Sequence, residues 1–265
     1  MKEHILQALS PDYPWKEHFH WVSETGSTND DLKILAKQGA PHGTILIADR
    51  QSGGHGRMGR SFHSPEGVGI YLSILLRPDC APTELMHLTC ATAVAMCDAV
   101  EDAIGLRPGI KWTNDLVHGK RKLGGILTEL GLTPRGMVDY VIIGIGINCC
   151  QKKEDFAADI QDIAASLSMV TGTEVDRAKV AAAMMDALHA MSCTLFSGKF
   201  VMFRQYRRDC ITVGQDISIL RGDSVQHAHA LDVDEEGALV VRYPDGTVAA
   251  VNSGEVSVRG MYGYL

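Results

Sequence analysis

The sequence predicts a mixed α/β (α+β) fold with a small all-β domain at its C-terminal end. Along the first 210 residues, apolar positions switch between helical spacing and the short continuous runs of buried strands. After Cys210, only short apolar runs separated by tight turns remain, which is typical of a small β-barrel. A chain of 265 residues, 45% of them hydrophobic, is long enough for one large and one small domain.

The first half of the large domain is expected to contain two helices and two strands. A polar segment at residues 27–29 precedes apolar residues of helical spacing that stop at Gly39, so residues 30–38 are expected to form a capped helix. A longer helix is expected to begin at Pro82 and to end at Gly105. The strands are the apolar runs at residues 44–48 and 69–76.

The second half is expected to add three strands and three helices before the small domain begins. The strands are residues 110–112, 123–130 and 138–147, and the helices are residues 159–170, 176–196 and 200–208. The small domain is expected to hold strands at residues 216–220, 229–233, 238–242, 247–251 and 255–259. We place the domain boundary near Ile211, which divides the chain into residues 1–210 and 211–265.

The composition excludes several classes of function. The formal net charge is −7, and an acidic chain is a poor sequence-independent DNA binder because such affinity comes from Lys and Arg contacts with phosphates. No apolar run approaches the roughly 18 to 20 residues that span a bilayer. The N-terminus has no signal-peptide pattern, and seven cysteines without a CxxC pair indicate reduced thiols. We therefore expect a cytoplasmic protein that binds neither DNA nor a membrane.

A glycine-rich loop at residues 53–59 is the first candidate site. Its GxGxxG pattern lacks the following helix that a dinucleotide site needs, so a Rossmann site is disfavoured. The loop carries His55 and Arg57, with Arg60 just beyond it. Glycine lets the backbone approach a ligand closely, and a guanidinium binds phosphate or carboxylate with paired hydrogen bonds. An anion-binding loop is therefore a better interpretation than a solvated turn.

The segment at residues 111–125 is the second candidate. A turn at residues 118–120 is expected to bring Asp115 close to Lys122. A carboxylate beside several cations fits magnesium polyphosphate, whereas the alternative is a surface hairpin whose ion pair is worth less than about 1 kcal/mol. These residues alone do not decide between the two. Two glycines at residues 124–125, inside a strand, favour the ligand site because they suggest a close backbone approach.

Two further segments are weaker candidates. Helix capping fully explains residues 27–29, although a helix N-terminus also offers N–H groups to a ligand. At residues 144–148 an apolar strand containing two glycines ends on a polar residue, which suits a ligand face.

Taken in order, these segments resemble the biotin protein ligases over nearly the whole chain, from about Phe19 to Arg259. Each segment is weak alone, but the ordered set is specific. It consists of Ser27-Thr28-Asn29, Gln51, Gly54-His55-Gly56-Arg57 through Arg60, Ser64-Pro65, Lys111-Trp112-Thr113-Asn114-Asp115, Lys122-Leu123-Gly124-Gly125-Ile126-Leu127, and residues 144–148, 164–167 and 253–257. The resemblance implies a catalytic domain related to class II synthetases and lipoate ligases, with an SH3-like C-terminal domain. Because Ser27 lies so close to the start of the sequence, the DNA-binding winged helix of some members is not expected.

The resemblance also implies a reaction in two steps. Biotin and MgATP give biotinyl-5′-AMP and pyrophosphate, and a lysine of a biotin carboxyl carrier protein then attacks the mixed anhydride. Adenylation is needed because a carboxylate is a poor acyl donor at neutral pH. No protein nucleophile is required, so catalysis would depend on positioning the reactants and neutralising phosphate charge. A monomer or a homodimer is expected.

The resemblance assigns roles to individual residues. The substrate-binding residues are Ser27, Thr28, Asn29, Gln51, Gly54, His55, Gly56, Arg57, Lys122 and Gly124. The nucleotide-binding residues are Arg57, Arg60, Lys111, Trp112, Asn114, Lys122 and Asn148. The catalytic residues are Lys122, Arg57 and Asp115, and Asp115 is also the expected magnesium ligand.

The chain departs from the family pattern at two positions. The loop usually reads Gly-Arg-Gly-Arg, whereas here His55 replaces the first arginine, and Phe62 replaces the usual tryptophan. A free imidazole is mostly neutral at pH 7. Losing a charge-assisted hydrogen bond costs about 1.5 to 3 kcal/mol, so retention of biotin or its adenylate is expected to be roughly ten- to a hundredfold weaker than with arginine.

Two rival functions stay open on the sequence alone. One is a lipoate or other acyl-acid ligase on the same scaffold, against which the glycine loop and the segment Lys111–Asp115 favour biotin. The other is a non-catalytic sensor of biotin or its adenylate, disabled by His55. The presence of Lys122 and Asp115 argues against a sensor.

Overall fold

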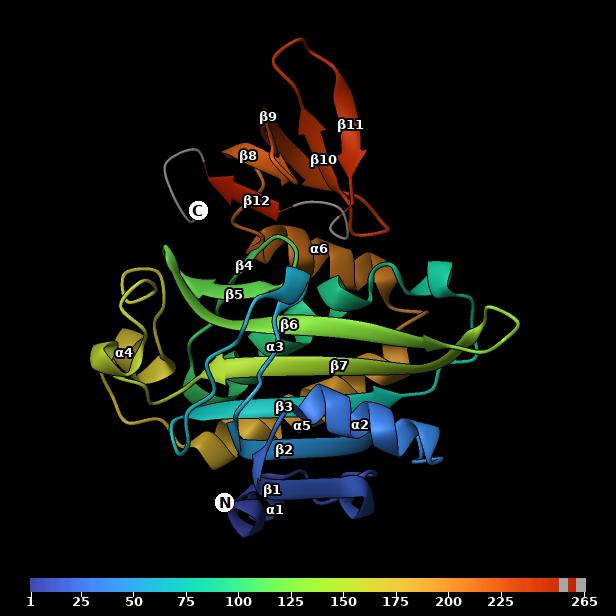
Figure 1. Ribbon diagram of the computed structural model, residues 1–265, viewed down its shortest axis with the longest axis vertical. Coiled ribbons are helices and arrows are strands. Elements are labelled where there is room, and N and C mark those ends of the chain that lie inside the picture. The colour runs from blue at the N-terminus through green and yellow to red at the C-terminus, as the bar shows by residue number, and fades with distance from the viewer. Residues whose placement is uncertain (253–256, 261–265) are drawn as a thin grey trace.

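The computed structural model describes residues 1–252 and 257–260, and consists of two sheets with helices around the larger one (Figure 1). The sequence segment 253–256, including the start of the expected strand at 255, lies outside the described residues. The seven-stranded sheet has the order β1-β2-β3-β7-β6-β5-β4. Its strands are β1 (Phe19–Thr25), β2 (Thr44–Gln51), β3 (Gly69–Leu76), β4 (Gly109–Lys111), β5 (Asp115–His118), β6 (Arg121–Leu132) and β7 (Val138–Asn148). The strands β1 and β2 are parallel, and the other neighbouring pairs are antiparallel.

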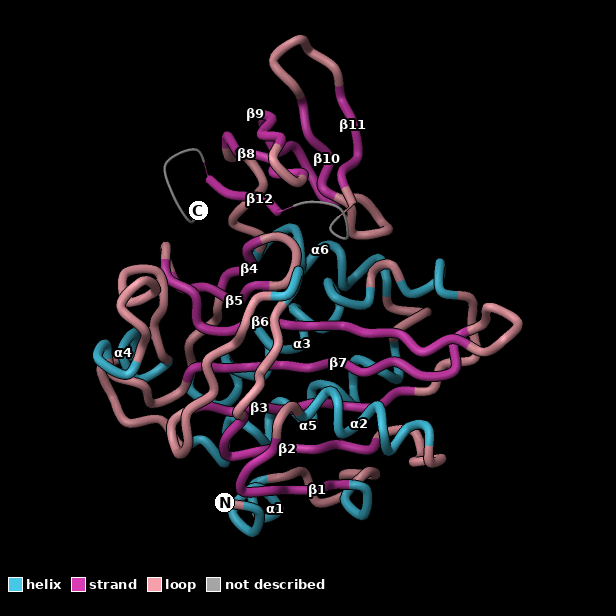
Figure 2. Tube along the Cα trace, viewed as in Figure 1, coloured by secondary structure: helices cyan, strands magenta, loops and turns pink. Residues whose placement is uncertain are grey.

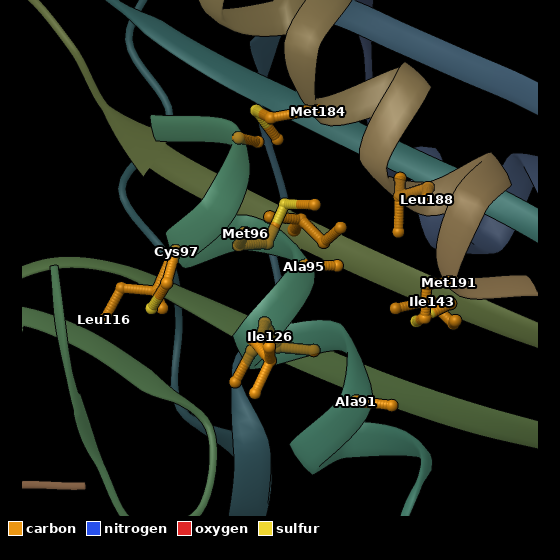
Figure 3. Packing of buried hydrophobic residues seen from close by; sticks show 14 of the residues in the cluster. Ala91, Ala95, Met96, Cys97, Leu116, Ile126, Ile143, Met184, Leu188 and Met191 are labelled. Carbon is orange, nitrogen blue, oxygen red and sulfur yellow. The ribbon is translucent and has the colours of Figure 1, made fainter. Parts of the chain in front are cut away.

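Helices cover both faces of this sheet. The long helices pack together on one face, and Figure 3 shows Ala95, Met96, Met184, Leu188 and Met191 in the resulting core with Ile126 and Ile143. The opposite face is partly covered by α2, whose Leu32 and Ala36 pack on Leu46, Leu75 and Ile142. The helices are α1 (Lys2–Ala8), α2 (Thr28–Lys37), α3 (Leu88–Ile104), α4 (Leu167–Thr171), α5 (Arg177–Thr194) and α6 (Lys199–Asp209).

Two helix predictions are wrong in part. The helix expected from Pro82 is a 3₁₀ turn at Pro82–Leu85, and α3 begins only at Leu88. The helix expected at residues 159–170 is reduced to α4. Upstream of α4 the chain pairs with the beginning of β6 instead, because Lys122 N donates to Ile163 O at 2.7 Å and Ala165 N donates to Lys122 O at 2.9 Å. These hydrogen bonds replace helical ones.

The C-terminal strands form an antiparallel sheet in the order β11-β10-β9-β8-β12, open within the described residues. They are β8 (Asp216–Arg221), β9 (Ser224–Val233), β10 (Leu239–Arg242), β11 (Val248–Val251) and β12 (Ser257–Gly260). The indole of Trp112 joins this sheet to the large domain, since its Nε1 donates to Gly237 O at 3.0 Å. The predicted fold class is confirmed, whereas the boundary at Ile211 stays a prediction. No helix in the described part of the chain has the length and apolar character of a membrane span.

Candidate functional site

A cavity of about 650 Å³ opens on the face of the large sheet near the N-terminus of α2. The β2–β3 connection, which contains the glycine loop, crosses the sheet here and is drawn in pink in Figure 2. The cavity brings together most of the predicted site residues: Ser27, Thr28, Asn29, Gln51, His55, Gly56, Arg57, Arg60, Lys111, Trp112, Asn114, Asp115 and Lys122.

The N-terminus of α2 forms one end of the cavity, and here the capping interpretation is wrong. Ser27 occupies the N-cap position, but its side chain makes no capping hydrogen bond, and α2 begins at Thr28 rather than at residue 30. Gln51 of β2 supplies the missing partner, because its Oε1 accepts from Thr28 N at 2.9 Å and from Thr28 Oγ1 at 3.0 Å. The helix end and the neighbouring strand are therefore joined through the cavity wall.

Among the buried hydroxyl and amide oxygens at this end, there are more hydrogen-bond contacts than hydroxyl protons to fill them. Ser73 Oγ lies 2.6 Å from Asn29 Oδ1 and 2.7 Å from Thr28 Oγ1, in addition to the contact of Thr28 Oγ1 with Gln51 Oε1. The three oxygen–oxygen contacts share only the two hydroxyl protons of Thr28 and Ser73. A ligand that brings N–H groups satisfies such a wall better than one that has none.

The other end of the cavity is cationic. Lys122 Nζ donates to Asp115 Oδ1 at 2.6 Å, as the expected hairpin predicts. Arg57 NH1 donates to Asn114 Oδ1 at 2.9 Å, so the glycine loop is tied to the turn between β4 and β5. Burial lowers the pKa of the Arg57 guanidinium, and Asp115 acts in the opposite direction. The arrangement suits a ligand that carries negative charge.

The glycine loop is held by its own hydrogen bonds, by one contact with α2 and by one contact with the sheet face. Gly56 N donates to Arg60 O at 2.6 Å. His55 Nε2 lies 3.1 Å from Asp30 Oδ2 of α2. The ring of Phe62 lies over Gly146 of β7, where an added Cβ would be 2.4 Å from the ring. The loop therefore spans the cavity between α2 and β7.

Three predicted binding residues do not line the cavity. Strand alternation puts Gly125 on the cavity face and Gly124 on the opposite face, where an added Cβ would meet Gly146 O at 2.4 Å. At Gly54 an added Cβ would meet Phe62 O at 2.5 Å, so this glycine serves the close approach of the two arms of the loop. The amide of Asn148 is used within the protein, donating to Ala165 O at 3.1 Å.

Sequence reasoning missed several residues of the site. The cavity wall includes Asp159, Ile160 and Ile163, which lie where a helix was expected. Ser73 and Glu129 contact Asn29 from β3 and β6, but they are ordinary polar residues within apolar strands. Each lies an even number of residues from a position that faces the cavity side of the sheet. This spacing identifies them as site residues only once the strand register is known.

Comparison with known proteins assigns these features to a class. Residues 22–148 match the biotin/lipoate A/B protein ligase family, and residues 212–259 match the biotin protein ligase C-terminal domain. The fold and the cavity therefore define a ligase of the biotin/lipoate type.

Individual relatives narrow the class. The chain is 34% identical to the bifunctional ligase/repressor BirA of Bacillus subtilis, with 87% of this chain and 71% of that protein covered. It is 31% identical to the biotin–[acetyl-CoA-carboxylase] ligase of Mycobacterium tuberculosis, with 89% and 86% covered. The biotin protein ligase of Aquifex aeolicus, solved in complex with biotin and ATP, superposes with a TM-score of 0.78 at 28% identity over 91% of this chain and 98% of that one. The chain belongs to the biotin protein ligase family.

Proposed function

We propose that this protein activates biotin with ATP as biotinyl-5′-AMP and transfers the biotinyl group to a lysine of a biotin carboxyl carrier protein. The observation that carries the choice of biotin is the excess of acceptors around Ser73. The cyclic urea of biotin has two N–H donors, whereas the dithiolane ring of lipoate has none. A wall that is short of protons therefore favours biotin over the lipoate alternative.

The cationic end of the cavity is suited to the carboxylate and the phosphates. Lys122 and Arg57 would hold the biotin carboxylate close to the α-phosphate and neutralise the charge that develops there. Arg60, Lys111, Trp112 and Asn114 line the same wall and would contact the nucleotide. Because both reactants are held in one cavity, positioning replaces covalent catalysis by the protein.

Magnesium fits the carboxylates of the cavity wall. Within the described residues, no three His, Cys, Asp or Glu side chains form a dedicated metal cluster. Mg²⁺ in nucleotide sites is usually held by one or two carboxylates together with the substrate phosphates. Asp115 and Asp159 both line the cavity, and Asp115 would be the main protein ligand. When bound, the ion neutralises charge on the phosphates.

The transfer step requires an acceptor lysine that enters the same cavity. Asp115 lies beside Lys122 and would help to deprotonate the incoming ε-amine. The amine nitrogen then bonds to the biotinyl carbonyl carbon while AMP leaves with the electron pair of the broken C–O bond.

All seven cysteines are free thiols, which supports a cytoplasmic location. The absence of DNA binding and a monomeric or dimeric state stay predictions.

Pyrophosphate release and mass spectrometry test this function. The full chain with MgATP and biotin is expected to release pyrophosphate, and a biotin carboxyl carrier domain added to it should gain one biotinyl group on a single lysine. Turnover excludes the non-catalytic sensor. Release of pyrophosphate with lipoate but not with biotin would establish the lipoate alternative instead.

A further inference from the structure

A chain of polar contacts links the glycine loop to the acceptor-rich end of the cavity through a residue outside the cavity wall. Glu129 of β6 accepts from Asn29 Nδ2 at 2.8 Å through Oε2, and from Lys33 Nζ at 2.7 Å through Oε1. Lys33 also donates to Asp30 Oδ1 at 3.0 Å, and the other oxygen of Asp30 faces His55. In this series of contacts, Glu129 touches the cavity residue Asn29, and Asp30 touches the cavity residue His55.

The sheet register explains why Glu129 reaches Asn29. Leu127 of β6 and Ser73 of β3 both pair with Gly144 of β7, so these positions share the face that α2 covers. Glu129 is two residues beyond Leu127 and points to the same face. Gly144 leaves the space that Asn29 occupies, because an added Cβ there would lie 2.2 Å from Asn29 Oδ1.

Glu129 determines which way the Asn29 amide points. An ionised carboxylate only accepts hydrogen bonds, so the NH₂ group of Asn29 must face it. The carbonyl oxygen then faces the buried Ser73 and also Gly144, which lines the cavity. If the carboxylate were absent, a half-turn of the amide would exchange the two groups and present a donor where the cavity now presents an acceptor.

We propose that Glu129 is a positioning residue that keeps the Asn29 oxygen turned toward the ligand, so that the cavity accepts the N–H groups of its acid substrate. This role rests on the proposed function. Glu129 does not line the cavity, and it acts through Asn29. Lys33 holds the second carboxylate oxygen. Partial burial lowers the pKa of Lys33, but hydrogen bonds to Glu129 and Asp30 outweigh it, so the pKa is raised and the ion pair is favoured.

An exchange of charges between the two positions tests the role directly. Glu129→Gln keeps the size of the side chain but no longer forces the Asn29 amide into one orientation, and biotin binding to the full chain is expected to weaken about tenfold in calorimetry. Asn29→Asp alone places a second carboxylate against that of Glu129 and should weaken biotin binding at least as much. In the double variant, the introduced glutamine amide can donate to an aspartate that offers only acceptors. Biotin affinity is therefore expected to recover to within about threefold of the natural chain.

Two controls separate positioning from stability. Lys33→Met removes the ion pair but leaves the carboxylate facing Asn29, so the biotin dissociation constant should change by less than about threefold even if the melting temperature falls. The KM for ATP should stay constant in Glu129→Gln. Unchanged biotin affinity in Glu129→Gln, or no recovery in the double variant, overturns the role of Glu129. Failure of the natural chain to bind biotin would instead overturn the proposed function.

Discussion

The ammonium of Lys122 and the carboxylate of Asp115 meet directly above Gly125, at an Nζ–Oδ1 distance of 2.6 Å. An added Cβ at Gly125 would lie 3.2 Å from Lys122 Nζ and 3.4 Å from Asp115 Oδ1. The missing side chain at Gly125 thus lets the pair lie flat on the cavity floor. The two adjacent glycines predict that some group approaches the backbone closely here. At Gly125 that group is the side chain of Lys122.

Replacement of this lysine should remove the first step of the reaction. Lys122→Met removes a charge-assisted hydrogen-bond donor at the cationic end and leaves Asp115 without this partner. Two such interactions at about 1.5 to 3 kcal/mol each correspond to a loss of a hundredfold or more in pyrophosphate release with biotin. Lys153→Met is the matched control, since Lys153 forms an exposed pair with Asp162 at 3.0 Å. Equal rates in the two variants would contradict the role of Lys122.

The sequence was sufficient for the architecture and for the two ends of the cavity. Strand and helix periodicity located most elements, because these are amphipathic or buried along their own length, whereas α1, β1 and β5 were not predicted. The hairpin turn at residues 118–120 predicted the contact of Asp115 with Lys122, which depends on local geometry alone. Positions within one hairpin or loop were therefore accessible from the sequence.

What the sequence could not provide depends on contacts between distant segments. The N-terminus of α2 receives its hydrogen bonds from Gln51 rather than from Ser27, which only the packing of β2 beside α2 reveals. The same is true of Glu129, which is 100 residues from Asn29 in the chain. Gly124 and Gly125 could not be told apart either, because a shift of one residue in register exchanges the two faces of a strand.

The histidine in the glycine loop should make the retention of biotin and its adenylate weaker than an arginine at the same position would. His55 contacts Asp30 at 3.1 Å, a contact that arginine could also make with a permanent charge. His55→Arg is therefore expected to tighten biotin binding and slow release of the adenylate by roughly ten- to a hundredfold. Calorimetry with biotin and a chase experiment with preformed adenylate measure the two effects. Unchanged dissociation constants would show that position 55 does not control retention.

The contact of Phe62 with Gly146 should make these positions strongly interdependent. Gly146→Ala would place a Cβ about 2.4 Å from the Phe62 ring, so the ring must shift away from the sheet. We expect the KM for biotin and for ATP to rise about tenfold or more. In a Phe62→Leu background the smaller side chain leaves space, so the same alanine should have an effect at least about threefold smaller. Additive effects of the two substitutions would mean that the loop does not rest on Gly146.

Buried His87 should make the protein less stable in mild acid. Its Nε2 donates to Leu195 O at 2.8 Å, and burial lowers the pKa of the ring. Because the unfolded chain then binds the proton first, the free energy of unfolding falls as the pH drops below about 6.5, by at most about 1.4 kcal/mol per pH unit for this group. His87→Gln keeps a donor for Leu195 but cannot be protonated, so urea denaturation between pH 7 and 5 should show a shallower decline. The pKa of His42 is also lowered, and its share of the decline should persist in the variant. Parallel stability curves for the two proteins would assign the acid sensitivity to other groups.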